Sequence, residues 1–407
     1  MLKHDVVIVG GGAGGLAAAA SLLRRQPSLD IAVVEPRETH DYQPGYTLIG
    51  AGVFTIGDVR RPMAKVMPKG VTWLKTSVQA FDPGKDEIIL ADGQILSYRV
   101  LIVATGNRLD FEAIDGLKET LGRNGVTSNY RPDLAPYTWD LVRNLRSGAA
   151  LFTQPPMPIK CAGAPQKAMY LSANHWEREG VLGNVQVTFH SAAPTLFGVK
   201  EYVPALEQTI DRYGIETHFG NNLIAVDGEA RLATFKSGDT VETRSFDMLH
   251  VTPPQKAVEV VANSFLSDKG GYVDVDQQTL QHRLFANVFA IGDIGNMPNA
   301  KTAAAVRKQA PVVAGNVLAV LAKKPLKAAY DGYGSCPLTV ENGKTLLAEF
   351  GYGGALLPSF PKFVIDGTKP SRLAWHLKKD LLPAIYWDAT LKGREWLAAP
   401  AELKKAA

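Results

Sequence analysis

The amino-terminal segment constrains the fold more than any other part of the chain. An apolar strand over residues 5–9 runs directly into the pattern Gly10-x-Gly12-x-x-Gly15, and a helix is expected to follow. Glu35 closes the next apolar strand, about 20 residues further on. Such glycines let a pyrophosphate approach the backbone, the helix N-terminus attracts its charge, and the carboxylate binds ribose hydroxyls. The chain is therefore predicted to begin with a dinucleotide-binding α/β domain.

Two later strands indicate which dinucleotide binds. Residues 100–106 form an apolar strand ending in Thr105-Gly106, and residues 287–293 form another ending in Gly292-Asp293. In flavoproteins with two dinucleotide-binding domains, the chain leaves the FAD domain after the first kind of strand and returns with the second. We therefore predict FAD as the cofactor and tandem Rossmann-like domains, the glutathione-reductase-like α/β fold. The predicted limits are 1–112 with 265–330 for the FAD domain, 113–264 for the inserted domain and 331–407 for a carboxy-terminal region.

The inserted domain lacks a second glycine turn. Its first predicted strand, residues 149–153, leads into a loop that contains Cys161 and no GxGxxG pattern. The strand over residues 185–190 is followed by Ser191-Ala-Ala-Pro, which is not such a turn either. A nicotinamide donor is therefore disfavoured, because its phosphates would have no predicted site.

Only two cysteines occur in the chain, Cys161 and Cys336, too few for a secreted disulfide framework. Cys161 follows Lys160 and precedes a helix that Pro165 is expected to start, and both features lower a thiol pKa. Cys336 lies in a loop bounded by glycine and proline residues. A free cysteine is also commonly a buried structural residue. The sequence does not show whether the two meet, so both interpretations stay open.

Several segments together resemble the sulfide:quinone oxidoreductase family, in particular its two-cysteine branch that includes the mitochondrial enzyme. The similarity extends over nearly the whole chain and is far more specific than a glycine turn alone. The segments that carry it are Tyr42-Gln-Pro-Gly-Tyr-Thr-Leu-Ile-Gly-Ala-Gly52, Lys160-Cys-Ala-Gly-Ala-Pro-Gln-Lys167, His250-Val-Thr-Pro-Pro254, Lys301-Thr-Ala-Ala-Ala305 and Tyr333-Gly-Ser-Cys-Pro-Leu338.

The resemblance implies an FAD-dependent enzyme that oxidises hydrogen sulfide and reduces a membrane quinone of the ubiquinone type. Cys161 and Cys336 would form a disulfide near the flavin, with or without an extra bridging sulfur. Hydrosulfide would attack it and leave a persulfide on one cysteine. The other thiolate, which we expect to be Cys336, would add to the flavin and deliver two electrons. The persulfide sulfur would leave to a small acceptor or as polysulfide.

The resemblance also implies which residues contact FAD. Lys301 would place a positive charge near the pyrimidine end of the flavin ring and stabilise its anionic reduced form. The alternative for Lys301 is a solvated lysine at a helix start. Together with the glycine turn and the strand ends above, the predicted FAD contacts are Gly10, Gly12, Ala13, Gly14, Gly15, Glu35, Gln43, Val78, Thr105, Gly106, Gly292, Asp293, Lys301 and Thr302.

One departure from the family pattern concerns a third cysteine. Other branches carry one upstream of Cys161, whereas the corresponding stretch here reads Val126-Thr-Ser-Asn-Tyr130. This difference argues against sulfur storage as a long polysulfide on three cysteines. It favours transfer to a small acceptor such as sulfite, glutathione or cyanide.

Neither a metal site nor a nucleic-acid site is predicted. The eight histidines show no metal-ligand spacing, and His190 and His250 are expected to be structural. The net charge of +4 arises in residues 360–407, which hold nine Lys or Arg against five Asp or Glu. A basic tail suits an anionic surface, and no nucleic-acid motif accompanies it.

The basic tail is predicted to contact a membrane. Residues 371–382 are typical of an amphipathic helix, which Pro383 interrupts before residues 384–392 continue it. Two helices docked on the protein's own surface, or a subunit interface in a homo-oligomer, are the alternatives. Interleaved lysines and four aromatic side chains favour an interfacial helix on anionic lipid: Trp375, Tyr386, Trp387 and Trp396.

The predicted location is the cytoplasmic face of a bacterial inner membrane, as a peripheral protein. No stretch reaches the ~20 apolar residues of a spanning helix. The first strand starts too close to Met1 to leave room for a signal peptide.

Three other functions stay open on the sequence. An NADH:quinone oxidoreductase of the same fold is disfavoured by the missing second glycine turn and by the paired cysteines. A flavoprotein subunit that donates electrons to a cytochrome would normally be exported, and no export signal is visible. A non-catalytic flavin-binding interaction or sensor protein would have no turnover to lose when either cysteine is replaced.

Overall fold

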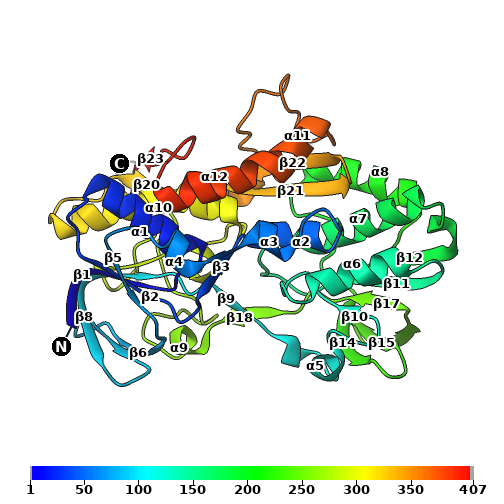
Figure 1. Cartoon of the computed structure of the whole chain (residues 1–407), viewed down its shortest axis with the longest axis horizontal. Helices are drawn as coiled ribbons and strands as arrows, with labels where there is room; N and C mark the ends of the chain where they lie inside the picture. Colours follow the sequence, from blue (N-terminus) through cyan, green and yellow to red (C-terminus); the bar gives the residue numbers. More distant parts are fainter. Residues whose placement is uncertain (1, 404–407) are drawn as a thin grey trace.

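The computed structural model describes residues 2–403, which form two main β-sheets side by side along the long axis (Figure 1). The first sheet has the strand order β5-β2-β1-β8-β7-β6, with β19 paired to β8. Its central strands run parallel and are apolar and buried, because α1 (Ala13–Arg25) and α10 (Ala303–Leu321) pack against them. The strands are β1 Leu2–Val9, β2 Ile31–Val34, β5 Val71–Leu74, β6 Val78–Asp82, β7 Glu87–Leu90, β8 Ile95–Val103 and β19 Val288–Ala290.

The second sheet has five parallel strands in the order β10-β17-β11-β12-β13. One face packs on α6 (Ala135–Asn144) and α7 (Ala164–Arg178), and a three-stranded antiparallel sheet covers the other. The predicted tandem Rossmann-like α/β fold is thereby confirmed. The strands are β10 Val126–Thr127, β11 Gly148–Gln154, β12 Val185–Ser191, β13 Glu216–Phe219 and β17 Met248–His250, with β14 Asn222–Asp227, β15 Leu232–Ser237 and β16 Thr240–Ser245 in the small sheet.

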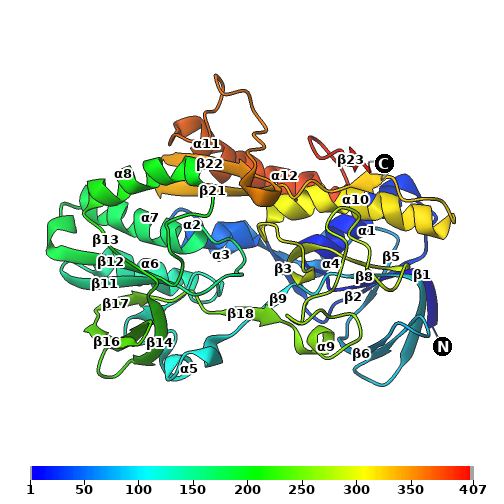
Figure 2. The ribbon, with the colours of Figure 1, turned by 180° about the vertical axis from the view of Figure 1, so that it is seen from behind.

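The chain passes between the two sheets through a pair of short strands. β9 (Asn107–Leu109) leads out of the first sheet, and β18 (Gln255–Ala257) pairs antiparallel with it on the way back (Figure 2). All strands of the second sheet lie between these two crossings. The exact limits of the predicted domains remain a proposal.

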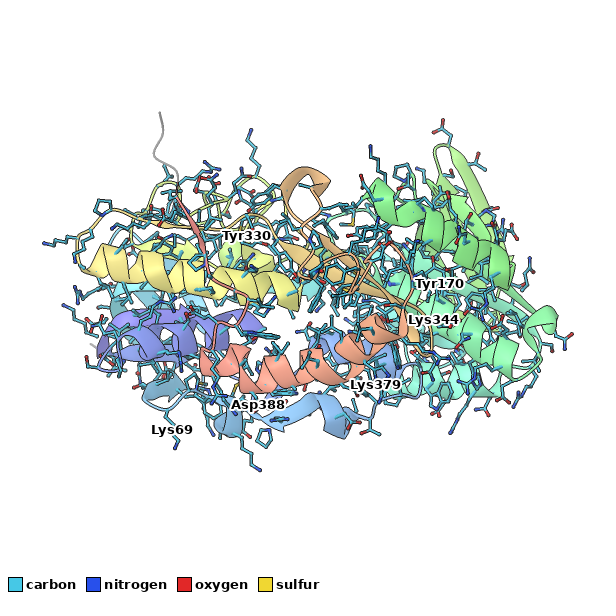
Figure 3. The ribbon with its side chains drawn as sticks, turned by 90° about the horizontal axis from the view of Figure 1, so that it is seen from above. Lys69, Tyr170, Tyr330, Lys344, Lys379 and Asp388 are labelled. Carbon is cyan, nitrogen blue, oxygen red and sulfur yellow. The ribbon has the colours of Figure 1, made fainter. Side chains whose placement is uncertain are left out.

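The carboxy-terminal region spans both sheets. A hairpin of β21 (Gly334–Glu341) and β22 (Lys344–Phe350) packs on α7 and α10. It is followed by α11 (Arg372–His376), a π-helical turn over Leu377–Leu381, and α12 (Leu382–Asp388). From above, the helices that carry Lys379 and Asp388 run along the molecule (Figure 3). Pro383 occupies the first turn of α12, where a missing N–H is tolerated, so a new α-helix begins there directly after the π-helical turn.

The predicted interfacial role of the tail aromatics is wrong for three of the four residues. Trp375, Tyr386 and Trp387 are at most 6% exposed, because they pack on the protein's own helices and on residues around Tyr42. Only Trp396, at 56% exposure, faces outward. Among residues 2–403, no helix is both long enough and apolar enough to cross a membrane.

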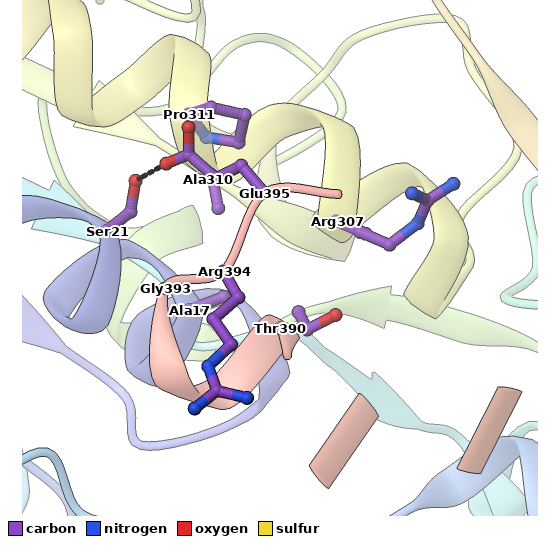
Figure 4. A pocket seen from close by; sticks show the side chains of 9 residues that line it. All are labelled: Ala17, Ser21, Arg307, Ala310, Pro311, Thr390, Gly393, Arg394 and Glu395. Atoms are coloured by element: carbon purple, nitrogen blue, oxygen red, sulfur yellow. Dashed lines mark hydrogen bonds between the residues drawn. The ribbon is translucent and has the colours of Figure 1, made fainter. Parts of the chain in front are cut away.

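The segment after α12 folds back over α1 and is fixed there. Ser21 Oγ donates to Glu395 at 2.6 Å (Figure 4). The Arg25 guanidinium pairs with the same carboxylate. The pocket beside these groups has a volume of only about 10 Å³, the space of one water molecule. Arg307 then donates to the carbonyl of Trp396, which holds the segment at the rim of a much larger cavity.

Candidate active site

The glycine turn after β1 brings strand and helix into direct contact. Gly10 has φ +107°, a conformation that glycine adopts without strain, and a Cβ there would lie 2.5 Å from the carbonyl oxygen of Ala104. A Cβ on Gly15 would lie 1.9 Å from the carbonyl oxygen of Gly10. Gly12, in contrast, faces open space. Glu35, which is 3% exposed, accepts a hydrogen bond from Gly11 N at 2.8 Å. The turn is therefore tight on the protein side and open on the other.

A cavity of about 810 Å³ extends from this turn to Cys161 and the carboxy-terminal helices. Its volume suits a dinucleotide. On its wall, Thr47 Oγ1 and both polar side-chain atoms of Asn129 are buried without a partner among the described residues, which is typical of a polar ligand site. The residues therefore fit FAD. All predicted contacts line the cavity except Gly15, whose role is packing: Gly10, Gly12, Ala13, Gly14, Glu35, Gln43, Val78, Thr105, Gly106, Gly292, Asp293, Lys301 and Thr302.

Three charged groups lie at the middle of this cavity. Lys160 Nζ donates to Gln43 Oε1 at 2.9 Å, and Lys301 Nζ donates to the carbonyl of Gly295 at 2.8 Å. Burial lowers the pKa of both lysines, and burial raises the pKa of Asp293 against their opposing charges. Lys301 is 8% exposed, so the alternative of a solvated lysine does not hold.

The structure brings the two cysteines together. Cys161 Sγ and Cys336 Sγ are 3.9 Å apart, although 175 positions separate them, because β21 packs on the start of α7. Cys161 N donates to the carbonyl of Lys301 at 2.9 Å, and the Tyr130 hydroxyl donates to the Cys161 carbonyl at 3.2 Å. These bonds hold Cys161 at φ +48°, a strained value for a residue with a side chain.

Only one of the two thiols borders the cavity. Cys161 is on its wall, whereas Cys336 points from β21 toward α7 and Gly163. Side chains alternate along a strand, so Ser335 and Pro337 face the cavity in its place. This geometry disfavours the expectation that Cys336 delivers electrons to the flavin, because Cys161 is the thiol on the cavity wall.

Two buried lysines, neither assigned a role by the sequence, surround the thiols. Lys167 Nζ donates to Cys161 Sγ at 3.1 Å and to Cys336 Sγ at 3.8 Å. The Cys336 thiol and the Lys167 charge hold the pKa of Cys161 well below its usual range, while the Cys161 charge and burial raise the pKa of Cys336. Lys378 Nζ donates to the carbonyl of Pro44 at 2.7 Å, and burial together with the Lys167 charge lowers its pKa to about 7. Lys167, rather than the predicted Lys160, is the cation that contacts the thiol.

The two histidines expected to be structural are fully buried. His190 lies between Thr188 and Asn221, and its ring stacks on Phe235. His250 Nε2 accepts a hydrogen bond from Asn129 N at 3.0 Å. Burial lowers the pKa of each to about 4, so both are neutral at pH 7.

Known proteins are similar to this chain over most of their length. The sequence profile of the family described as "Pyridine nucleotide-disulphide oxidoreductase" matches residues 4–309. The Dictyostelium discoideum protein "Sulfide:quinone oxidoreductase, mitochondrial" is 41% identical over 367 residues, covering 90% of this chain and 80% of that protein. The Mus musculus protein of the same name is 39% identical over 407 residues, covering 99% and 89%. The solved sulfide:quinone oxidoreductase of Aquifex aeolicus has a similar fold, with a TM-score of 0.82 at 18% identity over 97% of this chain and 92% of that chain.

Proposed function

The chain belongs to the sulfide:quinone oxidoreductase family, and we propose that Cys161 and Cys336 are the redox pair through which it oxidises sulfide. As a member of this family, the chain oxidises sulfide, carries the electrons on FAD and reduces a quinone. One observation carries the proposal: the two sulfur atoms lie 3.9 Å apart, Cys161 is on the wall of the dinucleotide cavity, and one lysine contacts both sulfur atoms.

In the proposed reaction, hydrosulfide attacks the Cys336 sulfur of a disulfide with Cys161. The S–S bond breaks, a new S–S bond turns Cys336 into a persulfide, and Cys161 leaves as a thiolate. One hydrosulfide and one disulfide thus give one persulfide and one thiolate. A thiol of lower pKa leaves faster, so the depressed pKa of Cys161 favours attack at Cys336.

The resting bridge can contain an additional sulfur. An S–S bond is about 2.05 Å long, so a direct disulfide needs the two sulfur atoms to approach from 3.9 Å. An inserted sulfur atom, held by two such bonds, needs a much smaller movement. We keep both forms within the proposal.

The cycle closes when a small nucleophile removes the outer sulfur of the persulfide. Sulfite, glutathione and cyanide are the proposed acceptors, and each would leave Cys336 as a thiolate. The two thiolates then re-form the disulfide and release two electrons, which FAD takes up when bound and the quinone finally receives. The residues proposed to hold FAD are those of the glycine turn, Glu35, and the strand ends that carry Thr105 and Asp293.

Lys167 is proposed to stabilise a thiolate, and Lys378 is proposed to accept and release a proton beside the thiols. Lys167 stabilises the departing Cys161 thiolate, because its ammonium is the nearest cation and is itself buried. Lys378 has a pKa of about 7, so near neutral pH its amine can take the proton that incoming sulfide brings and release it again.

The quinone is proposed to enter at the carboxy-terminal end of the cavity. This end is apolar and lies under the helices of the tail, which suits a neutral, lipid-soluble ring. The side chains that line it are Leu347, Phe360, Leu377, Leu382 and Ile385.

The membrane contact is proposed at the loop between β22 and α11, which stands away from the body of the molecule (Figure 1). Phe363 is 90% exposed there, and Lys362 directly precedes it. Nearby on the chain, Val364, Leu373 and Leu381 also expose apolar surface. Placement at the cytoplasmic face of a bacterial inner membrane stays a prediction, and both relatives described above are named mitochondrial.

The proposal is tested by adding sulfide anaerobically to the purified yellow protein and following the visible absorbance of the flavin. We expect rapid bleaching, reversal by a ubiquinone analogue, and loss of the bleaching by at least ~10³-fold in Cys161→Ser. Dithionite should still bleach the variant, which controls for flavin content. Bleaching by NADH and not by sulfide would instead support an NADH:quinone oxidoreductase.

A further inference from the structure

A buried carboxyl group outside the thiol site lies on the wall of the same cavity. Glu349 is on β22 and is 4% exposed. It is two residues from Leu347 on the strand, so both side chains face the apolar end of the cavity. The thiol chemistry proposed above does not use it.

The carboxyl group is bound only by uncharged donors. Tyr333 Oη and Ser359 Oγ each donate to Glu349 Oε1 at 2.5 Å, and Ser359 N donates to Oε2 at 3.0 Å. Among residues 2–403 no Lys, Arg or His forms an ion pair with it, and the charge of Lys308 acts on it only from a distance. Buried carboxylates in proteins are usually paired with a cation. A carboxyl without one, held in a cavity, is a candidate for proton transfer.

The three side chains form a continuous hydrogen-bonded cluster on the cavity wall. The hydroxyls of Tyr333 and Ser359 are 3.3 Å apart, so each member of the cluster contacts the other two. Both hydroxyl residues line the cavity: Tyr333 is 4% exposed, and Ser359 is half-buried beside the exposed Pro358. A proton can therefore pass between Ser359 and Tyr333 through Glu349, and Ser359 is the member that adjoins an exposed residue.

We propose that Glu349, with Tyr333 and Ser359, forms the relay that delivers a proton to the quinone during its reduction. The inference rests on the proposed quinone position at this end of the cavity. Reduction of a quinone to a quinol takes two electrons and two protons. The electrons come from sulfide, and the relay supplies one of the protons.

The proposed step conserves atoms and charge. The O–H bond of protonated Glu349 breaks, an O–H bond forms at a quinol oxygen, and a carboxylate remains. The proton moves either directly or through the Tyr333 hydroxyl, which gives its own proton to the quinol oxygen as it receives the one from Glu349. A proton from water then restores Glu349 through Ser359. The second proton reaches the quinol by a route outside this cluster.

The experiment measures the two half-reactions separately in the FAD-loaded protein. Flavin reduced with dithionite is mixed with a ubiquinone analogue in a stopped-flow instrument, and in a separate series oxidised flavin is mixed with sulfide. In Glu349→Gln we expect reoxidation by quinone to slow by about 10²-fold, and reduction by sulfide to stay within about twofold. Tyr333→Phe should slow reoxidation by a smaller factor. The matched control is Glu341→Gln on the other strand of the hairpin, whose carboxyl pairs with Arg212 and Lys344.

Two further readouts separate a relay from a structural role. Reoxidation of Glu349→Gln should slow further as the pH rises, because the proton must then come from solvent, while the wild-type rate changes less. The other titratable or charged groups around the cluster are Arg307, Lys308, Asp331, Tyr202 and Asp366. The same pH series is therefore recorded with Lys308→Met, to separate their contribution from that of Glu349. Quinone binding should change the carboxyl band of the infrared difference spectrum in wild type and not in Glu349→Gln.

The outcomes differ for the relay and for the proposed function. Equal slowing of both half-reactions, or unchanged reoxidation in Glu349→Gln and Tyr333→Phe, overturns the relay. Failure of quinone to reoxidise the wild-type flavin overturns the relay together with the quinone site. A third outcome is that sulfide fails to reduce the flavin, while quinone reoxidises the wild-type flavin normally and the Glu349→Gln flavin more slowly. This outcome supports the relay and overturns only the thiol chemistry.

Discussion

The two main sheets place the same strand–loop–helix unit at the same position and use it for different chemistry. In the first sheet, β1 connects to α1 through residues 10–12, and in the second, β11 connects to α7 through residues 155–163. Both strands lie inside their sheet, beside the next parallel strand along the chain. The first loop is short and exposes backbone, whereas the second is long and presents the Cys161 thiol. The loop that follows the strand therefore determines which ligand binds, and the shared architecture does not.

The strongest test of the first loop is Gly15→Ala. Its Cβ would lie 1.9 Å from the backbone oxygen of Gly10, and no side-chain rotation relieves such a clash. We expect the free energy of unfolding to fall by about 3 kcal/mol and the purified protein to lose FAD. Urea unfolding of the FAD-free protein and the flavin absorbance after purification measure the two effects.

Gly12→Ala is the matched control, because nothing lies within 4 Å of its Cβ position. It should keep the stability of the FAD-free protein and lose FAD affinity only. If both variants were equally stable, the tight contact between β1 and α1 would not be the reason for glycine at position 15.

The second loop depends on charge rather than on backbone access, and Lys167→Met tests this dependence. The substitution keeps most of the side-chain volume and removes the ammonium 3.1 Å from Cys161 Sγ. The pKa of Cys161 should rise toward the ordinary thiol value of about 8.5. Reduction of the flavin by sulfide at pH 7 should slow by about 10- to 100-fold.

The pKa change can be measured without turnover. Alkylation of Cys161 by iodoacetamide, followed by mass spectrometry, should vary little with pH in the wild type, because the thiolate persists to low pH. In Lys167→Met the alkylation rate should increase with pH through a clear inflection. An unchanged profile would show that Cys336 alone depresses the pKa of Cys161.

Local sequence signals predicted the parts of the site that depend on neighbouring residues. The glycine turn, the position of Glu35 and the start of α7 near Pro165 all follow from short-range rules. Lys167 had no such signal, because the burial of the first turn of α7 is visible only in the structure. It stands in the segment that carried the family resemblance, yet periodicity alone does not give the direction of its side chain.

Other features depend on packing between distant segments. The proximity of Cys161 to Cys336 arises from β21 on α7, and the orientation of Cys336 away from the cavity arises from strand alternation within that packing. The aromatic residues of the tail have the same amphipathic pattern whether they face lipid or protein. In the structure, Tyr386 donates to or accepts from His40 at 2.6 Å, a contact that no local pattern encodes.

The smallest expected effect in the comparison of the two loops concerns Lys378, which the carboxy-terminal helices place near the second loop. Its folded pKa of about 7 lies below the usual lysine value of about 10.4. Between these values the unfolded chain binds more protons than the folded one, so this residue makes stability rise with pH, and below pH 7 the folded state bears the full cost of the buried charge. In Lys378→Met the free energy of unfolding should no longer rise with pH through this residue. Above neutrality, the difference in the free energy of unfolding between the variant and the wild type should therefore change by about 1.4 kcal/mol per pH unit. Urea unfolding across this range measures it, with the more exposed Lys379→Met as control, and parallel curves for Lys378→Met and wild type would show that Lys378 keeps an ordinary pKa.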